Sequence, residues 1–85
     1  MRFEVQATQS AAKALNRLPK EVRKRVLDAL VELESQPRPP GVKKLVNRPA
    51  WRIRIGDYRV LYEIKEDRLI ILVVEIGHRR EIYRD

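Results

Sequence analysis

The stretch WRIRIGDYRVLYEI, residues 51–64, decides the fold of this chain. Two alternating runs of apolar and polar residues flank Gly56 and Asp57, a pattern typical of a β-hairpin with a two-residue turn. Gly56 can adopt the positive φ that such turns need, and Asp57 tolerates that conformation better than most residues do. The turn predicts the following cross-strand pairs: Ile55 with Tyr58, Arg54 with Arg59, Ile53 with Val60, and Trp51 with Tyr62.

Side chains alternate between the two faces of a β-strand, so this hairpin has one apolar face and one basic face. The apolar face carries Trp51, Ile53, Ile55, Tyr58, Val60, Tyr62 and Ile64. The opposite face, which we call the arginine face, carries Arg52, Arg54, Arg59, Leu61 and Glu63. We expect the rest of the chain to pack on the apolar face.

The arginine face is the candidate functional surface. Like charges directly opposite each other destabilise a sheet, so stability alone gives no reason to place Arg54 against Arg59. Planar guanidinium groups bind phosphate through paired, charge-assisted hydrogen bonds. Two interpretations fit this face: a phosphate-binding site, or a solvated basic surface whose arginines lie flat or pair with Glu63.

Composition limits the possible functions. The chain of 85 residues is long enough for one modest core, and its net charge of +7 indicates a polyanionic partner, either nucleic acid or an acidic protein. With no cysteine and one histidine, we expect no disulfide, no metal site and no cofactor. The longest apolar run, Leu69–Val74, is too short to span a bilayer, and no apolar leader follows Met1. We therefore expect a cytoplasmic protein with no membrane association.

Two helices are predicted before the hairpin. Thr8 is a candidate N-cap for a helix over residues 9–17, and Pro19 begins a second helix that extends to about Ser35. Their apolar stripes predict two antiparallel helices that pack on the apolar face of the hairpin.

Two further strands complete the predicted sheet. Residues 2–7 alternate as a short half-buried strand, and the aliphatic run Leu69–Val74 predicts a central strand buried on both sides. The predicted fold is α+β, a single domain over residues 1–85. Its two N-terminal antiparallel helices pack on one face of an antiparallel sheet of about four strands, in the order β-α-α-β-β-β.

Residues 36–50 hold four of the five prolines and predict an irregular connector. This connector contains the cations Arg38, Lys43, Lys44 and Arg48 and no acidic residue. Either it is a solvated loop, or these cations form a basic rim that steers a polyanion toward the arginine face.

Alternation along the last strand predicts which of its side chains lie beside the arginines. The side chains predicted on the arginine face are Ile70, Leu72, Val74, Ile76 and His78. Glu75 then falls on the apolar face beside Tyr58, where a carboxylate does not fit. A β-bulge, or a position beyond the reach of the helices, would explain this inconsistency.

Two segments resemble the RelE-like toxins of the RelE/ParE superfamily: residues 51–64, quoted above, and IGHRREIYR at 76–84. The predicted order of elements fits that fold, so the resemblance covers the whole chain. It implies the toxin of a type II toxin–antitoxin system, an endoribonuclease that cleaves mRNA in the ribosomal A site and so inhibits translation. It also implies a cognate antitoxin that binds the toxin in a hetero-oligomer.

The resemblance also implies site residues. The cleft residues carried over by position are Arg52, Arg54, Arg59, Arg79 and Tyr83. Arg59 and Arg79 would stabilise the charge on the phosphoryl oxygens without a metal, and Tyr83 would stack on a base or assist proton transfer. The cations assigned to RNA binding are Arg52, Arg54, Lys43, Lys44 and Arg48.

The identity of the general base is open. The best-known members have lysines where Arg52 and Arg54 stand, and arginine, unlike lysine, stays protonated in proteins. His78 is a catalytic candidate, because imidazole exchanges protons near neutral pH and its predicted face is the arginine face. The other interpretation of His78 is a surface or packing residue.

Two alternative functions are also consistent with the sequence. One is a ParE-like toxin that inhibits DNA gyrase by binding and cleaves nothing. The other is an inactive relative that binds RNA or the ribosome through the same face, with an affinity that falls steeply as salt rises.

Overall fold

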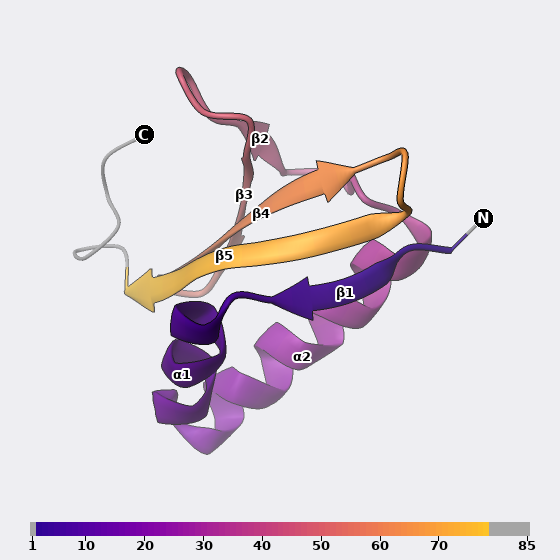
Figure 1. Ribbon diagram of the computed structural model, residues 1–85. Coiled ribbons are helices and arrows are strands. Elements are labelled where there is room, and N and C mark those ends of the chain that lie inside the picture. Colours follow the sequence, from indigo (N-terminus) through magenta and orange to yellow (C-terminus); the bar gives the residue numbers. More distant parts are fainter. Residues whose placement is uncertain (1, 79–85) are drawn as a thin grey trace.

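The computed structural model, which describes residues 2–78, consists of a five-stranded sheet with two helices on one of its faces (Figure 1). The elements are β1 (Glu4–Ala7), α1 (Gln9–Arg17), α2 (Lys20–Ser35), β2 (Lys43–Lys44), β3 (Trp51–Ile55), β4 (Tyr58–Lys65) and β5 (Ile70–His78). The strand order across the sheet is β1-β5-β4-β3-β2. This arrangement confirms the predicted α+β class with both helices on one side.

The sheet is mixed, whereas the sequence predicted an antiparallel one of about four strands. β1 pairs parallel with β5, from Glu4 opposite Ile70 to Ala7 opposite Val73. A parallel pair needs a long crossover between its strands, and the intervening helices and hairpin provide it. The fifth strand is β2, which lies inside the proline-rich connector and pairs antiparallel with β3.

The hairpin of β3 and β4 has the predicted register at every pair. Gly56 has φ +60, and a Cβ at this position would lie 3.4 Å from Nη1 of Arg25 on α2. Such a Cβ would make an ordinary contact with a flexible side chain, so it is the positive φ that makes the turn need glycine.

The helix boundaries follow local rules. Thr8 caps α1, because its Oγ1 accepts a hydrogen bond of 3.2 Å from the backbone N–H of Ala11. Leu18 has an extended backbone and ends α1, as expected for a residue that precedes proline. Pro19 is the N-cap of α2 and not its first helical residue, so the helix begins at Lys20, one residue later than the sequence predicted.

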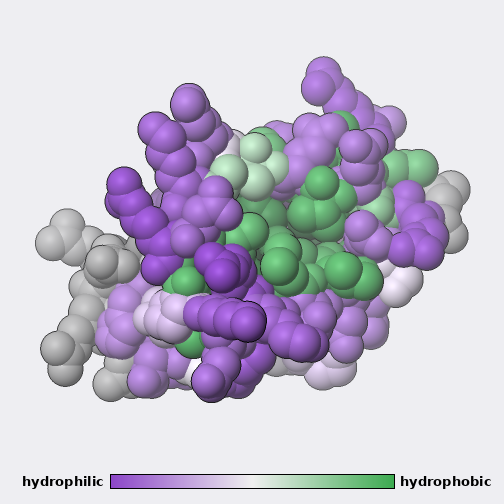
Figure 2. Space-filling model, turned by 90° about the horizontal axis from the view of Figure 1, so that it is seen from below, coloured by the Kyte–Doolittle hydropathy of each residue, from purple (hydrophilic) through white to green (hydrophobic). Residues whose placement is uncertain are grey.

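The main core lies between the helices and the sheet. Its buried members are Ala11, Leu18, Val26, Leu30, Leu33, Ile55, Val60, Tyr62, Ile71, Val73 and Ile76. Figure 2 views the molecule from the helix side, where polar residues (purple) surround a smaller apolar area (green). Leu27 and Val31 of α2 are among the exposed large apolar residues.

A second cluster lies on the opposite side of the sheet. It contains Leu45 and Ala50 from the connector and Leu61 from β4, with Val74 of β5 packed against them. Because Leu61 belongs to the arginine face, the connector packs on that face through this cluster. The connector is thus partly an ordered, packed segment and not only a solvated loop.

Candidate nucleic-acid interface

The hairpin register puts three arginines on the face opposite the main core, although Arg54 also lines a shallow hollow with Asp28 and Glu32 of α2. Arg52 and Arg54 come from β3 and Arg59 from β4, and Arg54 lies directly opposite Arg59. Arg59 is buried, with 6% of its surface exposed, Arg52 is half-buried and Arg54 is exposed. Arg79 and Tyr83 lie outside the described residues.

A β-bulge changes the faces of β5. Leu61 pairs with Glu75, but the next residue of β4, Tyr62, pairs with Val73. Val74 is therefore the extra residue on β5. Thr8 is bonded to β5 here: its N–H donates to the Val73 carbonyl at 3.0 Å, and its hydroxyl donates to the Val74 carbonyl at 3.4 Å.

The bulge resolves the inconsistency at Glu75. Val73 and Ile76 both belong to the main core, although they are an odd number of positions apart, so Val74 and Glu75 both lie on the arginine side. Glu75 forms an ion pair there, with 3.2 Å between its Oε1 and Nη2 of Arg48. Glu75 was not among the predicted site residues, although its misfit on the apolar face was a signal of the bulge.

The same bulge reverses the predicted face of His78, and that prediction was wrong. Ile76, also predicted on the arginine face, is buried in the main core. The imidazole of His78 meets the ring of Tyr58 edge to face, with 5.4 Å between the ring centroids. One extra residue in a strand moves every later side chain to the other face. His78 is therefore on the helix side of the sheet, apart from the arginines.

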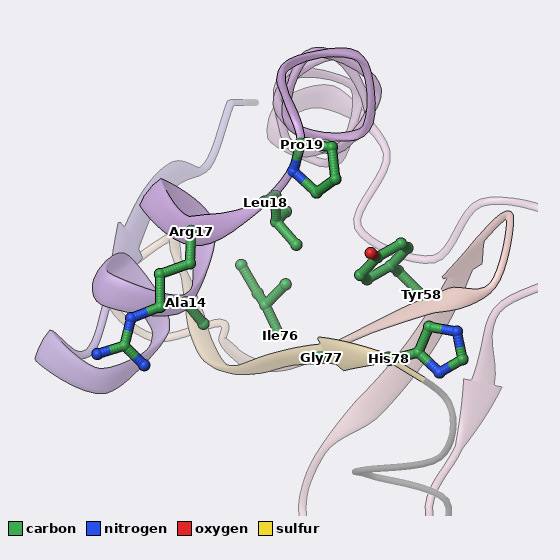
Figure 3. Close-up of a pocket in the computed structure, with 8 residues that line it drawn as sticks. All are labelled: Ala14, Arg17, Leu18, Pro19, Tyr58, Ile76, Gly77 and His78. Atoms are coloured by element: carbon green, nitrogen blue, oxygen red, sulfur yellow. The ribbon is translucent and has the colours of Figure 1, made fainter.

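On the helix side, His78 lines a cavity of about 270 Å³ between the helices and the ends of β4 and β5. Figure 3 shows His78 and Tyr58 at one end of this cavity and Arg17 at the other. Leu18 and Ile76 lie between them. Its other lining residues are Ala14, Pro19 and Gly77, and none of the three arginines of the arginine face lines it.

The connector adds cations to the interface, but it does not place all of them on one face. Lys43 pairs with Arg52 and lies on the arginine face, whereas Lys44 pairs with Trp51. The ammonium group of Lys44 donates to the carbonyl of Arg48 at 3.1 Å, which closes the segment between them. Arg48 is the connector cation that the ion pair with Glu75 holds against the sheet.

The start of the connector is anchored to the helix side of the sheet. The hydroxyl of Tyr62 donates to the carbonyl of Pro37 at 2.6 Å, and Arg38 lies 5.1 Å above the ring of Trp51. Burial raises the pKa of Tyr62 to about 12, although the charge of Arg38 acts in the opposite direction. Tyr62 was predicted only as part of the apolar face, because its hydrogen-bond partner is far away in the chain.

The assembled surface suits an extended anion. Arg52, Arg54 and Lys43 share the face with the buried Arg59, and Arg48 lies at its border. Glu63, also on this face, forms an ion pair of 2.7 Å with Lys65. The predominance of cations favours phosphate, and guanidinium groups on neighbouring strands can contact successive phosphates of a backbone. Neither of the two described helices, α1 and α2, has the length and apolar character that a membrane span requires.

Comparisons with known proteins place the chain in a family. The model of a family described as "ParE toxin of type II toxin-antitoxin system, parDE" matches residues 5–83. Toxin RelG of Mycobacterium tuberculosis is 31% identical over 90 residues, which cover 99% of this chain and 99% of the relative.

Solved structures of similar proteins support the same family assignment. The RelE–RelB complex of the archaeon Pyrococcus horikoshii contains a chain with a TM-score of 0.82 and 32% identity, covering 93% of this chain and 97% of that one. A chain of the intact Escherichia coli RelBE toxin–antitoxin complex has a TM-score of 0.81 at 24% identity, covering 89% and 95%, and supports the fold alone. The chain thus belongs to the RelE/ParE superfamily and is a RelE-like toxin of a type II toxin–antitoxin system.

Proposed function

We propose that this toxin is an endoribonuclease that cleaves mRNA in the ribosomal A site and so inhibits translation. The observation that carries the proposal is the direct opposition of Arg54 and Arg59, with Arg59 buried in the same face. This arrangement costs stability through like-charge repulsion, and an RNA phosphate held between the strands offsets that cost.

The proposed reaction is attack of an RNA 2′-oxygen on the adjacent phosphate. Arg59 and Arg79 stabilise the charge that develops on the phosphoryl oxygens, so the reaction needs no metal ion. Arg52 and Arg54 align the RNA backbone, and Tyr83 stacks on a base or assists proton transfer. His78 has no part in this proposal, because its imidazole lies on the helix side of the sheet.

The remaining cations extend the RNA-binding surface. Lys43 lies next to Arg52, and Arg48 is held at the border of the face by Glu75. In this proposal Lys43 and Arg48 contact backbone phosphates, while Lys44 fixes the shape of the connector and contributes through its charge.

We also propose a cognate antitoxin as partner. The archaeal neighbour is part of a RelE–RelB complex, and the E. coli neighbour is part of an intact RelBE toxin–antitoxin complex. A toxin with a net charge of +7 suits a partner with an acidic to amphipathic segment. Co-expression followed by size-exclusion chromatography tests whether the product of an adjacent gene forms a stable hetero-oligomer with the toxin.

The cleavage proposal is tested on programmed ribosomes. Wild-type protein is expected to cut mRNA within the A-site codon, with the cut positions mapped as new 5′ ends. Arg59→Ala is expected to lower the rate about a hundredfold or more, since removal of one charge-stabilising donor typically has that effect. Arg54→Ala, at an exposed position, tests the same face with less risk to folding.

A second candidate function is inhibition of DNA gyrase by binding, because the matching family model is described as ParE toxin. A supercoiling assay with purified wild-type protein separates the two. Inhibition of gyrase without mRNA cleavage would replace the ribonuclease proposal, whereas cleavage with unaffected gyrase would support it.

A further inference from the structure

The arginine face needs a proton acceptor if it is to cleave RNA, and its arginines cannot supply one. Arginine stays protonated in proteins, so Arg52, Arg54 and Arg59 bind and stabilise anions but remove no proton. Among the described residues, the sheet carries three carboxylates on this face, Glu4, Glu63 and Glu75. Glu4 lies on β1 opposite Ile70, at the end of β5 remote from Glu75. Glu63 and Glu75 differ in position and in contacts.

Glu75 is placed beside the reactive part of the face. It pairs with Leu61, so Arg59 is its diagonal neighbour on β4. Diagonal neighbours in an antiparallel pair lie about 7–8 Å apart. Two long side chains can span this distance, so Arg59 can contact a phosphate while Glu75 contacts the hydroxyl next to it. The Glu75 side chain is 40% exposed, so RNA can reach it.

Glu63 lies farther from Arg59. It pairs with Leu72 beyond the bulge, and its carboxylate is bound by Lys65 at 2.7 Å. The carboxylate of Glu75 instead meets Arg48 through Oε1 at 3.2 Å. Arg48 keeps this carboxylate on the arginine face and can itself bind a phosphate next to the reacting one.

We propose that Glu75 is the general base of the cleavage reaction, an inference that rests on the proposed ribonuclease function. The Glu75 carboxylate takes the proton of the RNA 2′-hydroxyl as the 2′-oxygen forms a bond to the adjacent phosphorus. The bond from phosphorus to the 5′-oxygen breaks, and the departing oxygen takes a proton from water. Glu75 returns its proton to the hydroxide so formed. The products are a 2′,3′-cyclic phosphate and a 5′-hydroxyl.

The charges that face Glu75 come from each neighbouring element. Arg48 of the connector contacts it directly, Arg59 of β4 is diagonal to it, and Arg52 lies on the same face of β3. Glu63 is the nearby carboxylate on β4, and His78, which lies on β5 with Glu75, is on the opposite side of the sheet. RNA binding adds a phosphate near Arg59, which keeps the charge of the site balanced.

The test is single-turnover mRNA cleavage on programmed ribosomes, followed from acidic to neutral pH. Glu75→Gln is expected to slow cleavage about a hundredfold or more and to remove the rise in rate that accompanies deprotonation of the base. Its affinity for RNA is expected to equal or exceed that of the wild type, because a negative charge has been removed. Glu75→Asp should retain the rise in rate at an intermediate level.

Two matched variants separate catalysis from positioning. Glu63→Gln removes a carboxylate from the same face and should cleave like the wild type. Arg48→Gln breaks the ion pair and should weaken RNA binding while the pH profile keeps its shape. The inference is overturned if Glu75→Gln keeps both its rate and its pH profile, or if Arg48→Gln reproduces the whole loss. A wild-type protein that cleaves no mRNA overturns the proposed function itself.

Discussion

The β3–β4 ladder and the β4–β5 ladder share the strand β4, but only the first follows the strict alternation of the sequence throughout. In the first, every residue from Trp51 to Ile55 has the partner that strict alternation predicts. In the second, the register shifts between Leu61 and Tyr62. The first ladder builds the arginine face from neighbours in sequence, and the second decides which residues of β5 join it.

The difference shows what a single inserted residue can do. A regular β5 would place His78 with the arginines and Glu75 among apolar side chains. The bulge does the opposite, because it lets Val73 and Ile76 both enter the main core. Burial of each of these two aliphatic side chains stabilises the fold by about 1.5–3 kcal/mol. Together they outweigh the ladder hydrogen bond that a bulge disrupts.

Leu61→Ala tests the cluster that joins the two ladders to the connector. Leu61 is 2% exposed and packs with Leu45 and Ala50, so its truncation should lower the free energy of unfolding by about 2–4 kcal/mol. Chemical denaturation measures the loss. Val46→Ala is the control, because Val46 is 70% exposed in the same connector and should cost less than about 0.5 kcal/mol. Equal losses in the two variants would mean that the cluster does not hold the connector.

Tyr62→Phe tests the residue on the other side of the register shift. It removes the hydroxyl that donates to Pro37, which should lower the free energy of unfolding by about 1–2 kcal/mol at neutral pH. Thermal and chemical unfolding of both proteins measure the difference. A loss below about 0.3 kcal/mol would mean that the hydrogen bond does not anchor the connector.

The stability difference between wild type and Tyr62→Phe should also depend on pH. The folded pKa of Tyr62 is about 12 against 10.0 in the unfolded chain, so the unfolded state loses its proton first as the pH rises. The contribution of this phenol to stability is full below pH 10 and is lost as the pH rises toward about 12. The stability difference between wild type and Tyr62→Phe should therefore shrink across that window. A constant difference would contradict the raised pKa.

His78→Gln tests the face reversal and has the smallest expected effect. The variant loses the edge-to-face contact with Tyr58, so the free energy of unfolding should fall by about 0.5–1 kcal/mol. The rate of the proposed mRNA cleavage and its pH profile should match those of the wild type within about twofold, since the imidazole is on the helix side. A changed pH profile would return His78 to the catalytic site.

The sequence predicted the parts of the site that depend on local rules. The Gly56-Asp57 turn and the alternation around it were sufficient to place Arg52, Arg54 and Arg59 on one face in the correct register. The Thr8 cap and the two helices were confirmed for the same reason, since capping and helical periodicity act within a few residues.

What the sequence determined by itself was therefore the hairpin, the helices and a concentrated basic face. The tertiary structure alone decided the parallel pairing of β1 with β5, the docking of the connector and the exchange of Glu75 for His78 on the arginine face. Each of these depends on contacts between residues distant in the chain. A strand with apolar residues on both faces fits two registers locally, and only the core that Val73 and Ile76 complete selects between them.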